Sequence, residues 1–259
     1  MAYIISSVNV NGVRAAAGKG MLAWLAATEA DIVCVQEVRA TDEQTRAALA
    51  PALAEGWWLA NAEPESKGRA GVAILSRREP HAVRIGFGSS EFDASGRYLE
   101  ADFGDVTVAS VYVHSGEAGT PRQDEKYRYL AELGAYLTTR TGEFVVSGDW
   151  NIAHTELDLK NWKGNLKSAG FLPDERAWID GLLAAGYVDV VRALHPGVEG
   201  PYSWWSYRGR AFDNDTGWRI DYQLARGELA TRAKQAVVER AAAYDQRWSD
   251  HAPVTVQYR

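Results

Sequence analysis

The sequence predicts an α/β protein in which β-sheets pack face to face beneath outer helices. Three observations support this fold class: strand-like apolar runs recur along the whole chain, amphipathic helical segments lie between them, and the composition is globular. The chain has 259 residues, of which 46% are hydrophobic and 24% charged. No linker or shift in composition divides it, so we expect a single domain over residues 1–259.

The first half of the chain is dominated by strand-like segments. Strands are expected at 3–10, 31–37, 57–60, 71–77, 82–87, 97–103 and 106–113. One helix is expected within 18–30, where apolar residues recur at helical spacing. Another is expected within 41–56; Thr41 or Asp42 would cap it, and Pro51 would shorten or bend it.

The second half repeats this mixture of strands and helices. Helices are expected at 122–140 and 174–186. The inner face of the first consists of Tyr127, Leu130, Leu133 and Leu137. Strands are expected at 143–149, 202–207, 218–225, 232–240 and 253–259.

Composition and charge exclude several classes of protein. There is no run of about 18 apolar residues and no signal-peptide pattern, so we expect a cytoplasmic protein with no membrane partner. The single cysteine, Cys34, lies in an apolar run and is interpreted as a core residue, not a nucleophile. The net charge is −6, so a polyanion would have to bind local positive patches or a bridging metal.

The segment VVSGDWNI places Asp149 and Asn151 at the end of a strand that otherwise belongs to the core. Residues two apart in an extended chain point to the same side, so both side chains would reach one spot. A turn is the simpler explanation, because Asp and Asn commonly end strands by bonding their own backbone. Other expected strands also carry polar residues at or near their ends: Asn9, Asn11, Gln36, Glu37, Tyr112, His114, Asp221, Asp250 and His251.

Taken together, these residues favour a metal-dependent phosphoryl-transfer site over a set of separate turns. Hard oxygen ligands, which suit Mg²⁺ or Mn²⁺, would come from Glu37, Asp250, Asp149 and Asn9. No cysteine pair or HExxH spacing supports zinc. Asp149 would act as a base and Asn151 as a hydrogen-bond donor. Asp221 would need a partner if buried, and the imidazole of His251 is a natural one.

In order along the chain, these motifs resemble those of the exonuclease III family of abasic-site endonucleases, within the endonuclease/exonuclease/phosphatase superfamily. The resemblance extends from about residue 3 to 258, through VNVNG, VQE, GRAGVAILS, SVYVHSG, GDWNI, DLKNWKGN, GFLPDERAW, YSWWSYR, GWRIDY and SDHAPV. It implies an α/β, four-layer sandwich of two packed mixed β-sheets flanked by helices, which is the DNase I-like fold.

The resemblance implies a metal side of the site. Glu37 and Asn9 would lie there, with Asp250 close to them. A second metal, if bound, would be held by Asp149 and Asn151. The ion would be Mg²⁺, and Mn²⁺ would substitute for it.

The resemblance also implies a catalytic side. Asp149 would handle the proton, and Asn151 would position the attacking water and the phosphate. Tyr112 matches an active-site tyrosine. Asp221 and His251 match a carboxylate–imidazole pair.

The activity that the resemblance implies is Mg²⁺-dependent hydrolysis of the phosphodiester 5′ to abasic sites in duplex DNA, with 3′–5′ exonuclease and 3′-end trimming activity. An enzyme that acts mainly as a 3′–5′ exonuclease or 3′-phosphodiesterase is the alternative, and a non-catalytic DNA-binding protein is a further one. The partner would be double-stranded DNA with abasic sites or 3′ ends, and we expect a monomer.

Candidate DNA contacts come from two basic segments and one aromatic segment. Trp204 matches the residue that lines the pocket for an extruded sugar. Arg69 is a candidate phosphate contact. Lys160, Lys163 and Lys167 are spaced at three and four residues, as on one face of a helical turn. They form either a phosphate track or a solvated basic face.

One segment departs from the family pattern. His114 and Ser115 stand where relatives often carry proline followed by an amide or serine. Serine reaches less far than an amide, which puts a phosphate contact from this loop in doubt. His114 is interpreted as a loop residue, with a DNA contact or an extra acid as alternatives.

Overall fold

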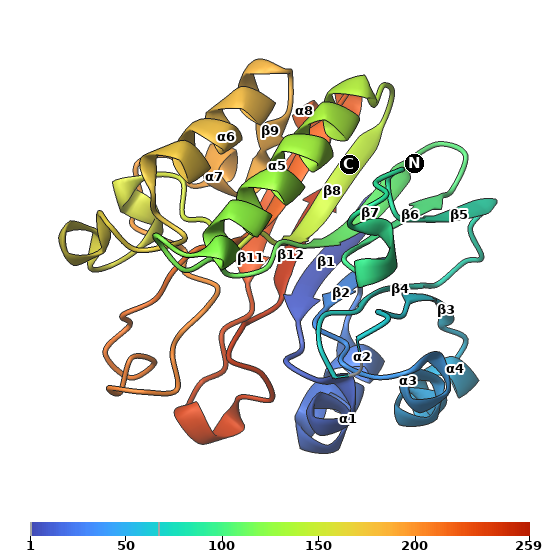
Figure 1. Ribbon diagram of the computed structural model, residues 1–259. Helices are drawn as coiled ribbons and strands as arrows, with labels where there is room; N and C mark the ends of the chain where they lie inside the picture. Colours follow the sequence, from blue (N-terminus) through green and yellow to red (C-terminus); the bar gives the residue numbers. More distant parts are fainter. Residues whose placement is uncertain (1, 67) are drawn as a thin grey trace.

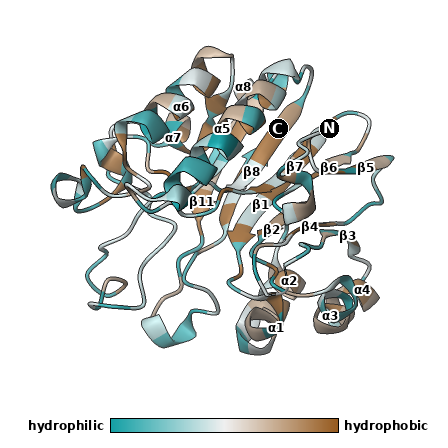
Figure 2. Ribbon diagram, viewed as in Figure 1, coloured by the Kyte–Doolittle hydropathy of each residue, from teal (hydrophilic) through white to brown (hydrophobic). Residues whose placement is uncertain are grey.

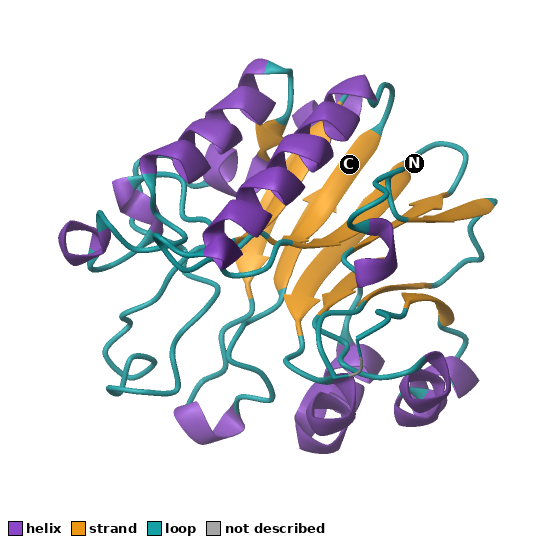
Figure 3. Cartoon of the chain, in the orientation of Figure 1, coloured by secondary structure: helices purple, strands orange, loops and turns teal. Residues whose placement is uncertain are grey.

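Two six-stranded mixed sheets pack face to face, with helices against the outer faces, in the computed structural model of the protein (Figure 1, Figure 3). The structure describes residues 2–66 and 68–259. One sheet has the strand order β11-β12-β1-β2-β4-β3 and the other β5-β6-β7-β8-β10-β9. The predicted four-layer sandwich is therefore confirmed. Among the described residues, no helix has the length and apolar character needed to cross a membrane.

The strands match most of the segments expected from the sequence. The first sheet consists of β1 (Tyr3–Asn9), β2 (Ile32–Gln36), β3 (Trp58–Ala62), β4 (Val72–Ser76), β11 (Ala233–Val238) and β12 (Val254–Tyr258). The second consists of β5 (Ala82–Ile85), β6 (Tyr98–Asp102), β7 (Thr107–Tyr112), β8 (Phe144–Asp149), β9 (Val188–Asp189) and β10 (Asp221–Arg226). Apolar side chains such as Ile5, Ile74 and Val108 fill the core between the sheets. Cys34 lies in this core, where burial raises the pKa of its thiol, so it is a core residue as predicted.

Helices form the two outer layers. Next to the first sheet lie α1 (Val13–Ala16), the π-helical turn η1 (Ala17–Met21), α2 (Leu22–Ala27), α3 (Asp42–Ala48) and α4 (Ala50–Ala54). Against the second lie α5 (Pro121–Thr139) and α6 (Pro173–Ala184), and α7 (Val190–Leu194) and α8 (Glu228–Arg232) close one side of the central core. Short 3₁₀ turns are η2 (Asp93–Ser95), η3 (Glu156–Asp158), η4 (Trp162–Asn165) and η5 (Tyr244–Gln246). Figure 2 shows a mainly hydrophilic outward face on α5 and a hydrophobic β8 beneath it.

The expected helix within 41–56 is divided in two. Thr41 caps α3 through a capping box with Gln44, and Pro51 lies in the first turn of α4. The break next to Pro51 confirms the predicted bend. The helix expected within 18–30 is also interrupted, because Gly20 has a φ of 146° that a regular helix does not contain.

The strand expected at 202–207 is wrong. Within the described residues, this segment makes only single bridges, from Trp204 to Trp218 and to His251. Its other aromatic residues do not alternate across a sheet: Tyr202 and Trp205 pack in a separate cluster with Phe212. Aromatic residues favour strands because they fit a half-buried surface. Here they are buried in a cluster of loop residues instead of on a sheet.

The register of the strands brings the candidate site residues to one end of the sandwich. Tyr112, Asp149 and Asp221 lie side by side across β7, β8 and β10. In the other sheet β1 ends at Asn9, beside the last residue of β2, and Glu37 follows directly. A hydrogen bond of 2.9 Å from Asn9 Nδ2 to Asp149 Oδ2 joins the two sheet ends.

Candidate active site

Asp149 is the buried centre of the site. Its Oδ2 accepts hydrogen bonds from Asn9 Nδ2 at 2.9 Å and from Asn151 Nδ2 at 3.1 Å. Its Oδ1 accepts one from the backbone N–H of Asn151 at 2.9 Å. The last bond is the turn that the sequence favoured, so the turn and the site coexist. The close approach to β7 explains Gly148, because a Cβ there would lie 1.9 Å from the Val111 carbonyl oxygen.

The side chain of Asn151 is held by two acceptors of the protein. Besides Asp149 Oδ2, its Nδ2 donates to the Val113 carbonyl oxygen at 2.8 Å. Both partners are acceptors, so the side-chain orientation is fixed and both amide hydrogens are used. In this structure both hydrogens are donated to the protein itself, and the donor role of Asn151 toward a phosphate stays a prediction. The atom that Asn151 leaves for a water molecule or a cation is Oδ1, an acceptor.

Asp221 and His251 form the predicted pair. Asp221 Oδ2 lies 2.9 Å from His251 Nδ1, and His251 Nε2 lies 3.8 Å from Asp149 Oδ2. Burial alone would lower the pKa of His251, but the charges of Asp221 and Asp149 raise it above its usual range. Burial raises the pKa of Asp149, with His251 opposing the rise and Asp221 and Glu37 adding to it. The imidazole is thus held between two buried carboxylates.

Glu37 and Tyr112 form the other side of the site. Glu37 follows β2 with a φ of 51° and makes an ion pair with Arg39. Burial raises the pKa of Tyr112, and the charges of Glu37 and Asp149 raise it further, so the phenol keeps its proton. The guanidinium of Arg97 lies 5.2 Å from the centre of the Tyr112 ring.

Asp250 is positioned by two residues from distant segments. Its Oδ1 accepts from Asn11 Nδ2 at 2.9 Å, and its Oδ2 accepts from Trp204 Nε1 at 3.1 Å. The neighbouring Ser249 Oγ donates to the Asn9 carbonyl oxygen at 2.6 Å and ties this loop to β1. The positioning roles of Asn11 and Ser249 were not predicted, although both lie in motifs that the sequence singles out.

The donors at this end of the sandwich suit a hard cation. Asp149, Asp221 and His251 offer donor atoms that lie within 4.8 Å of one another, and Asp221 Oδ1 is buried without a hydrogen-bond partner among the described residues. Asp149, Asp221 and His251 already pair with each other. A cation bound among them would therefore compete with the proton on the imidazole of His251. Of the predicted ligands, Glu37 contributes a further carboxylate, whereas Asn9 is turned toward Asp149.

An apolar pocket of about 160 Å³ opens beside Asn151. Its lining residues are Ser115, Gly116, Asn151, Ala169, Gly170, Trp204, Trp218 and Ile220. Trp204 was expected here from the sequence. Trp218 and Ile220 were not expected to line a pocket, because the sequence predicted a strand at 218–225. In the structure β10 begins only at Asp221, so both residues precede it.

The floor of this pocket is held by a buried ion pair that the sequence did not reveal. Lys126 Nζ donates to Glu175 Oε1 at 2.6 Å and to the Asn151 carbonyl oxygen at 2.9 Å. Glu175 Oε2 accepts from the amides of Gly170 at 2.6 Å and Leu172 at 3.0 Å. Since Lys126 and Glu175 are fully buried and satisfied, they fix the backbone on both sides of the pocket.

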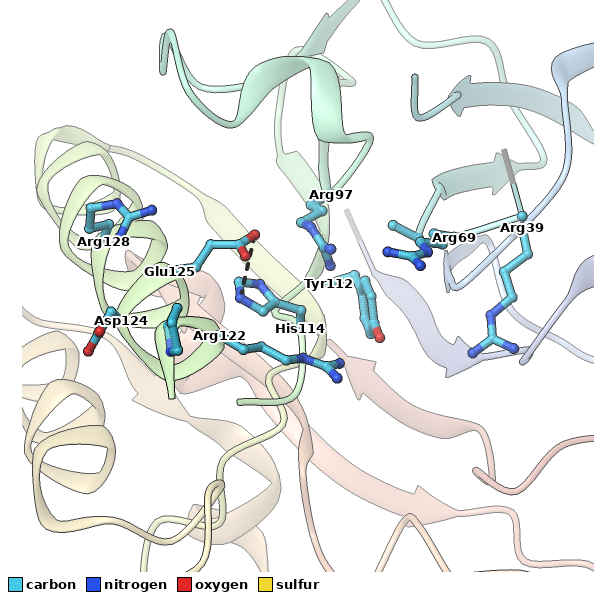
Figure 4. Close-up of a pocket in the computed structure, with 12 residues that line it drawn as sticks. Arg39, Arg69, Arg97, Tyr112, His114, Arg122, Asp124, Glu125 and Arg128 are labelled. Carbon is cyan, nitrogen blue, oxygen red and sulfur yellow. Dashed lines mark ion pairs between the residues drawn. The ribbon is translucent and has the colours of Figure 1, made fainter. Parts of the chain in front are cut away.

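A larger cleft of about 790 Å³ opens on the other side of Tyr112 (Figure 4). We call it the arginine cleft, because its lining includes Arg39, Arg69, Arg97, Arg122 and Arg128. Arg69 was predicted as a phosphate contact. The other four were not, because they follow β2, precede β6 or lie on α5, and only the fold brings them together.

The predicted lysine track is not a continuous helical face. Lys160 and Lys167 lie in turns, and Lys163 lies in the short 3₁₀ turn η4. The backbone amide of Lys160 donates to the Gly217 carbonyl oxygen at 3.1 Å. The spacing of three and four residues therefore does not correspond to one face of a helix here. Lys160 Nζ also pairs with Glu199 at 2.5 Å, which offsets its charge.

The fold and the site together define a hydrolase of the DNase I-like α/β class. The sequence pattern of the endonuclease/exonuclease/phosphatase family matches residues 6–251, and the chain belongs to that family. It is 38% identical to an exodeoxyribonuclease of Bacillus subtilis (strain 168) over 96% of each chain. It is 35% identical to the DNA repair nuclease APEX1 of Danio rerio, over 97% of this chain and 81% of that protein.

A solved structure is similar over almost the whole length. The 3′ phosphatase NExo from Neisseria, bound to a product DNA hairpin, is 31% identical, with a TM-score of 0.90 and 99% of both chains covered. The resemblance to the exonuclease III family is thereby confirmed. The protein is a phosphodiester hydrolase of this family.

Proposed function

We propose that the protein is a Mg²⁺-dependent DNA repair nuclease that cleaves the phosphodiester 5′ to abasic sites in duplex DNA and also trims 3′ ends. The observation that carries this proposal is the apolar pocket next to Asn151. Its small volume and its lining by Trp204, Trp218 and Ile220 suit a sugar ring that has lost its base. The names of the two relatives, an exodeoxyribonuclease and a DNA repair nuclease, point in the same direction.

In the proposed mechanism, Asp149 accepts the proton of the attacking water. Its buried environment raises its pKa, which makes its ionised form a stronger base than a solvent-exposed carboxylate, and the charge of His251 favours that ionised form. Asn151 Oδ1 accepts a hydrogen bond from the same water and orients it. His251, protonated because Asp221 holds it, donates to the phosphate oxygen on which negative charge develops.

A bound Mg²⁺ would stabilise the negative charge of the phosphate as a Lewis acid. Glu37 would hold it, together with the carboxylates of Asp149 and Asp250. Tyr112, which remains protonated, donates a hydrogen bond to the same phosphate. Glu37 follows β2, Asp149 ends β8 and Asp250 lies in the loop before β12, which explains why no short motif contains the whole site.

The second candidate is an enzyme that acts mainly on 3′ ends, and the likeness to the Neisseria 3′ phosphatase favours it. Two labelled duplexes with Mg²⁺ distinguish the candidates, one with an internal abasic site and one undamaged with a recessed 3′ end. We expect the abasic strand to be cut once, on the 5′ side, faster than the undamaged 3′ end is shortened. Shortening of the recessed end without incision would favour the second candidate.

Asp221→Asn should change the pH dependence of cleavage. Asp221 raises the pKa of His251, so the imidazole of the native enzyme stays protonated at neutral pH. Without that charge the pKa falls, and the protonated form is lost at a lower pH. The alkaline limb of the profile of kcat/KM against pH should move to lower pH by about one unit or more. His251→Gln, which lacks the imidazole, is the control. An alkaline limb that does not shift in Asp221→Asn would contradict the proposal that Asp221 keeps His251 protonated.

A further inference from the structure

We propose that Arg97, His114 and Arg122 in the arginine cleft form a second phosphate subsite, which binds the backbone phosphate 5′ to the scissile phosphate. The proposal rests on the function proposed above, because it assumes that the abasic sugar enters the apolar pocket. It adds which phosphate is bound, and by which residues.

The position of the cleft gives the direction of the strand. Tyr112 and His114 line the arginine cleft, whereas Ser115 and Gly116 line the apolar pocket, so one loop separates the two. A strand with its abasic sugar in the pocket and its scissile phosphate at Asp149 continues past Tyr112 into the cleft. Cleavage 5′ to the abasic sugar leaves that sugar on the 3′ side of the scissile phosphate. The cleft therefore takes the 5′ neighbour.

The charges in the cleft suit a phosphate. Arg39 is paired with Glu37, and Arg128 is paired with Glu91 at 2.7 Å. Arg122, in contrast, donates only to the hydroxyl of Ser115 at 2.8 Å, and Arg97 makes no ion pair with the described residues. Pro121 also lines the cleft, so the positive N-terminal end of the 19-residue helix α5 faces the same space.

Unsatisfied buried atoms supply the second argument. Both ring nitrogens of His114 and Arg97 Nη1 are buried without a hydrogen-bond partner among the described residues. His114 is only 4% exposed, so its sequence interpretation as an ordinary loop residue leaves two polar atoms unexplained. Burial lowers the pKa of His114 to about 3, the charges of Arg97, Lys126 and Arg122 add to the effect, and the backbone of Arg122 near the ring opposes it. The neutral ring still has one N–H, which can donate to a phosphate oxygen.

Figure 4 shows Arg97, His114 and Arg122 grouped on the side of Tyr112 away from Arg69 and Arg39. The ion pair of Glu125 with His114 is long, at 3.9 Å, and Glu125 is half exposed, so a phosphate can displace it. Two guanidinium groups and one imidazole thus line the same part of the cleft, whose described acidic lining residues are Asp124 and Glu125.

The test is a double-mutant cycle between protein and DNA. The duplex carries one abasic site, and a methylphosphonate, which has no charge, replaces the phosphate 5′ to the scissile one. Binding is measured with Asp149→Asn enzyme, which keeps the DNA intact, with and without Arg122→Ala. Arg122 is exposed, so its removal should not prevent folding. With normal DNA, Arg122→Ala should weaken binding about tenfold, the usual effect of losing a charge-assisted hydrogen bond.

With the methylphosphonate duplex, the same substitution should cost less than about twofold, because the phosphate is already missing. His114→Leu should behave in the same way. Two controls fix the position: a methylphosphonate on the 3′ side of the abasic sugar, and alanine at Lys160, Lys163 and Lys167. Both should leave the tenfold effect of Arg122→Ala unchanged. An equal loss with the two duplexes, or coupling to the 3′-side phosphate instead, would overturn the proposal.

The same cycle on a duplex with a recessed 3′ end separates this inference from the proposed function. Coupling on that duplex, with no incision of abasic DNA by the unmodified enzyme, would retain the subsite and reject the abasic-site activity. Incision of abasic DNA without coupling on either duplex would retain the abasic-site activity and reject the subsite.

Discussion

Asp149→Asn should lower the single-turnover rate of abasic-site cleavage by roughly 10²–10⁴, the usual range for loss of a general base. The physical reason is that the buried carboxylate is the acceptor closest to where the water must lie, and an amide cannot take its proton. DNA affinity should be kept or rise, because a negative charge near the phosphate is removed. The measurement is the cleavage rate with enzyme in excess, with the dissociation constant determined separately.

The neighbours of Asp149 determine the controls for this experiment. The new amide group places a donor where Asn9 and Asn151 already donate to Oδ2, so their hydrogen bonds must rearrange. The thermal midpoint should therefore be compared with that of Asn151→Ala, which removes one of these donors without adding another. Asn151→Ala should lose about 10²–10³ in rate, by analogy with other preorganised polar groups. A near-normal rate in Asp149→Asn would mean that its turn hydrogen bond is its whole role.

The sequence predicted the fold and the centre of the site because these depend on local patterns. Alternation and apolar runs identified the strands, and the strand ends contained Asp149, Asp221 and His251. Two parallel strand pairs then bring such ends to one edge, as the register of β7 with β8 shows. The hydrogen bonds could not be predicted in the same way. The sequence did not show, for example, that Asn151 Nδ2 donates both to the Val113 carbonyl oxygen and to Asp149.

The DNA-facing surfaces were less predictable, since they depend on tertiary packing. The lysine spacing between 160 and 167 is helical, but this stretch forms turns and the short 3₁₀ turn η4, and Leu159 just before it bridges Trp218. In the arginine cleft, Arg97 directly precedes strand β6, whereas Arg122 lies on helix α5, and the two share no motif. Single arginines on a surface are ordinary, and only the packing of β6 against α5 makes these two neighbours.

Removal of divalent metal should abolish cleavage, and Mg²⁺ or Mn²⁺ should restore it. The argument is the number of carboxylates at one end of the sandwich. The charges of Asp221 and Glu37 both raise the pKa of Asp149, and among the described residues the imidazole of His251 is the cationic side chain grouped with Asp149 and Asp221. Such a group gains most when a cation is present, because like charges in a buried site repel each other. Full activity in EDTA would contradict the metal assignment.

Glu37→Gln tests the same assignment at one residue. Glutamine keeps the size of the side chain and can still hydrogen bond to Tyr112, but it removes the charge that would hold the cation. Metal-assisted charge stabilisation contributes several kcal/mol, so we expect the rate of cleavage to fall by about 10²-fold or more.

A binding readout separates this loss from a folding defect: Mg²⁺ should raise the thermal midpoint of the native protein and raise that of Glu37→Gln much less. Arg39→Gln is the matched control, because it breaks the ion pair with Glu37 and leaves the carboxylate in place. If Mg²⁺ stabilised Glu37→Gln as strongly as the native protein, the cation would bind elsewhere, and Asp149, Asp221 and His251 would be the remaining candidate ligands.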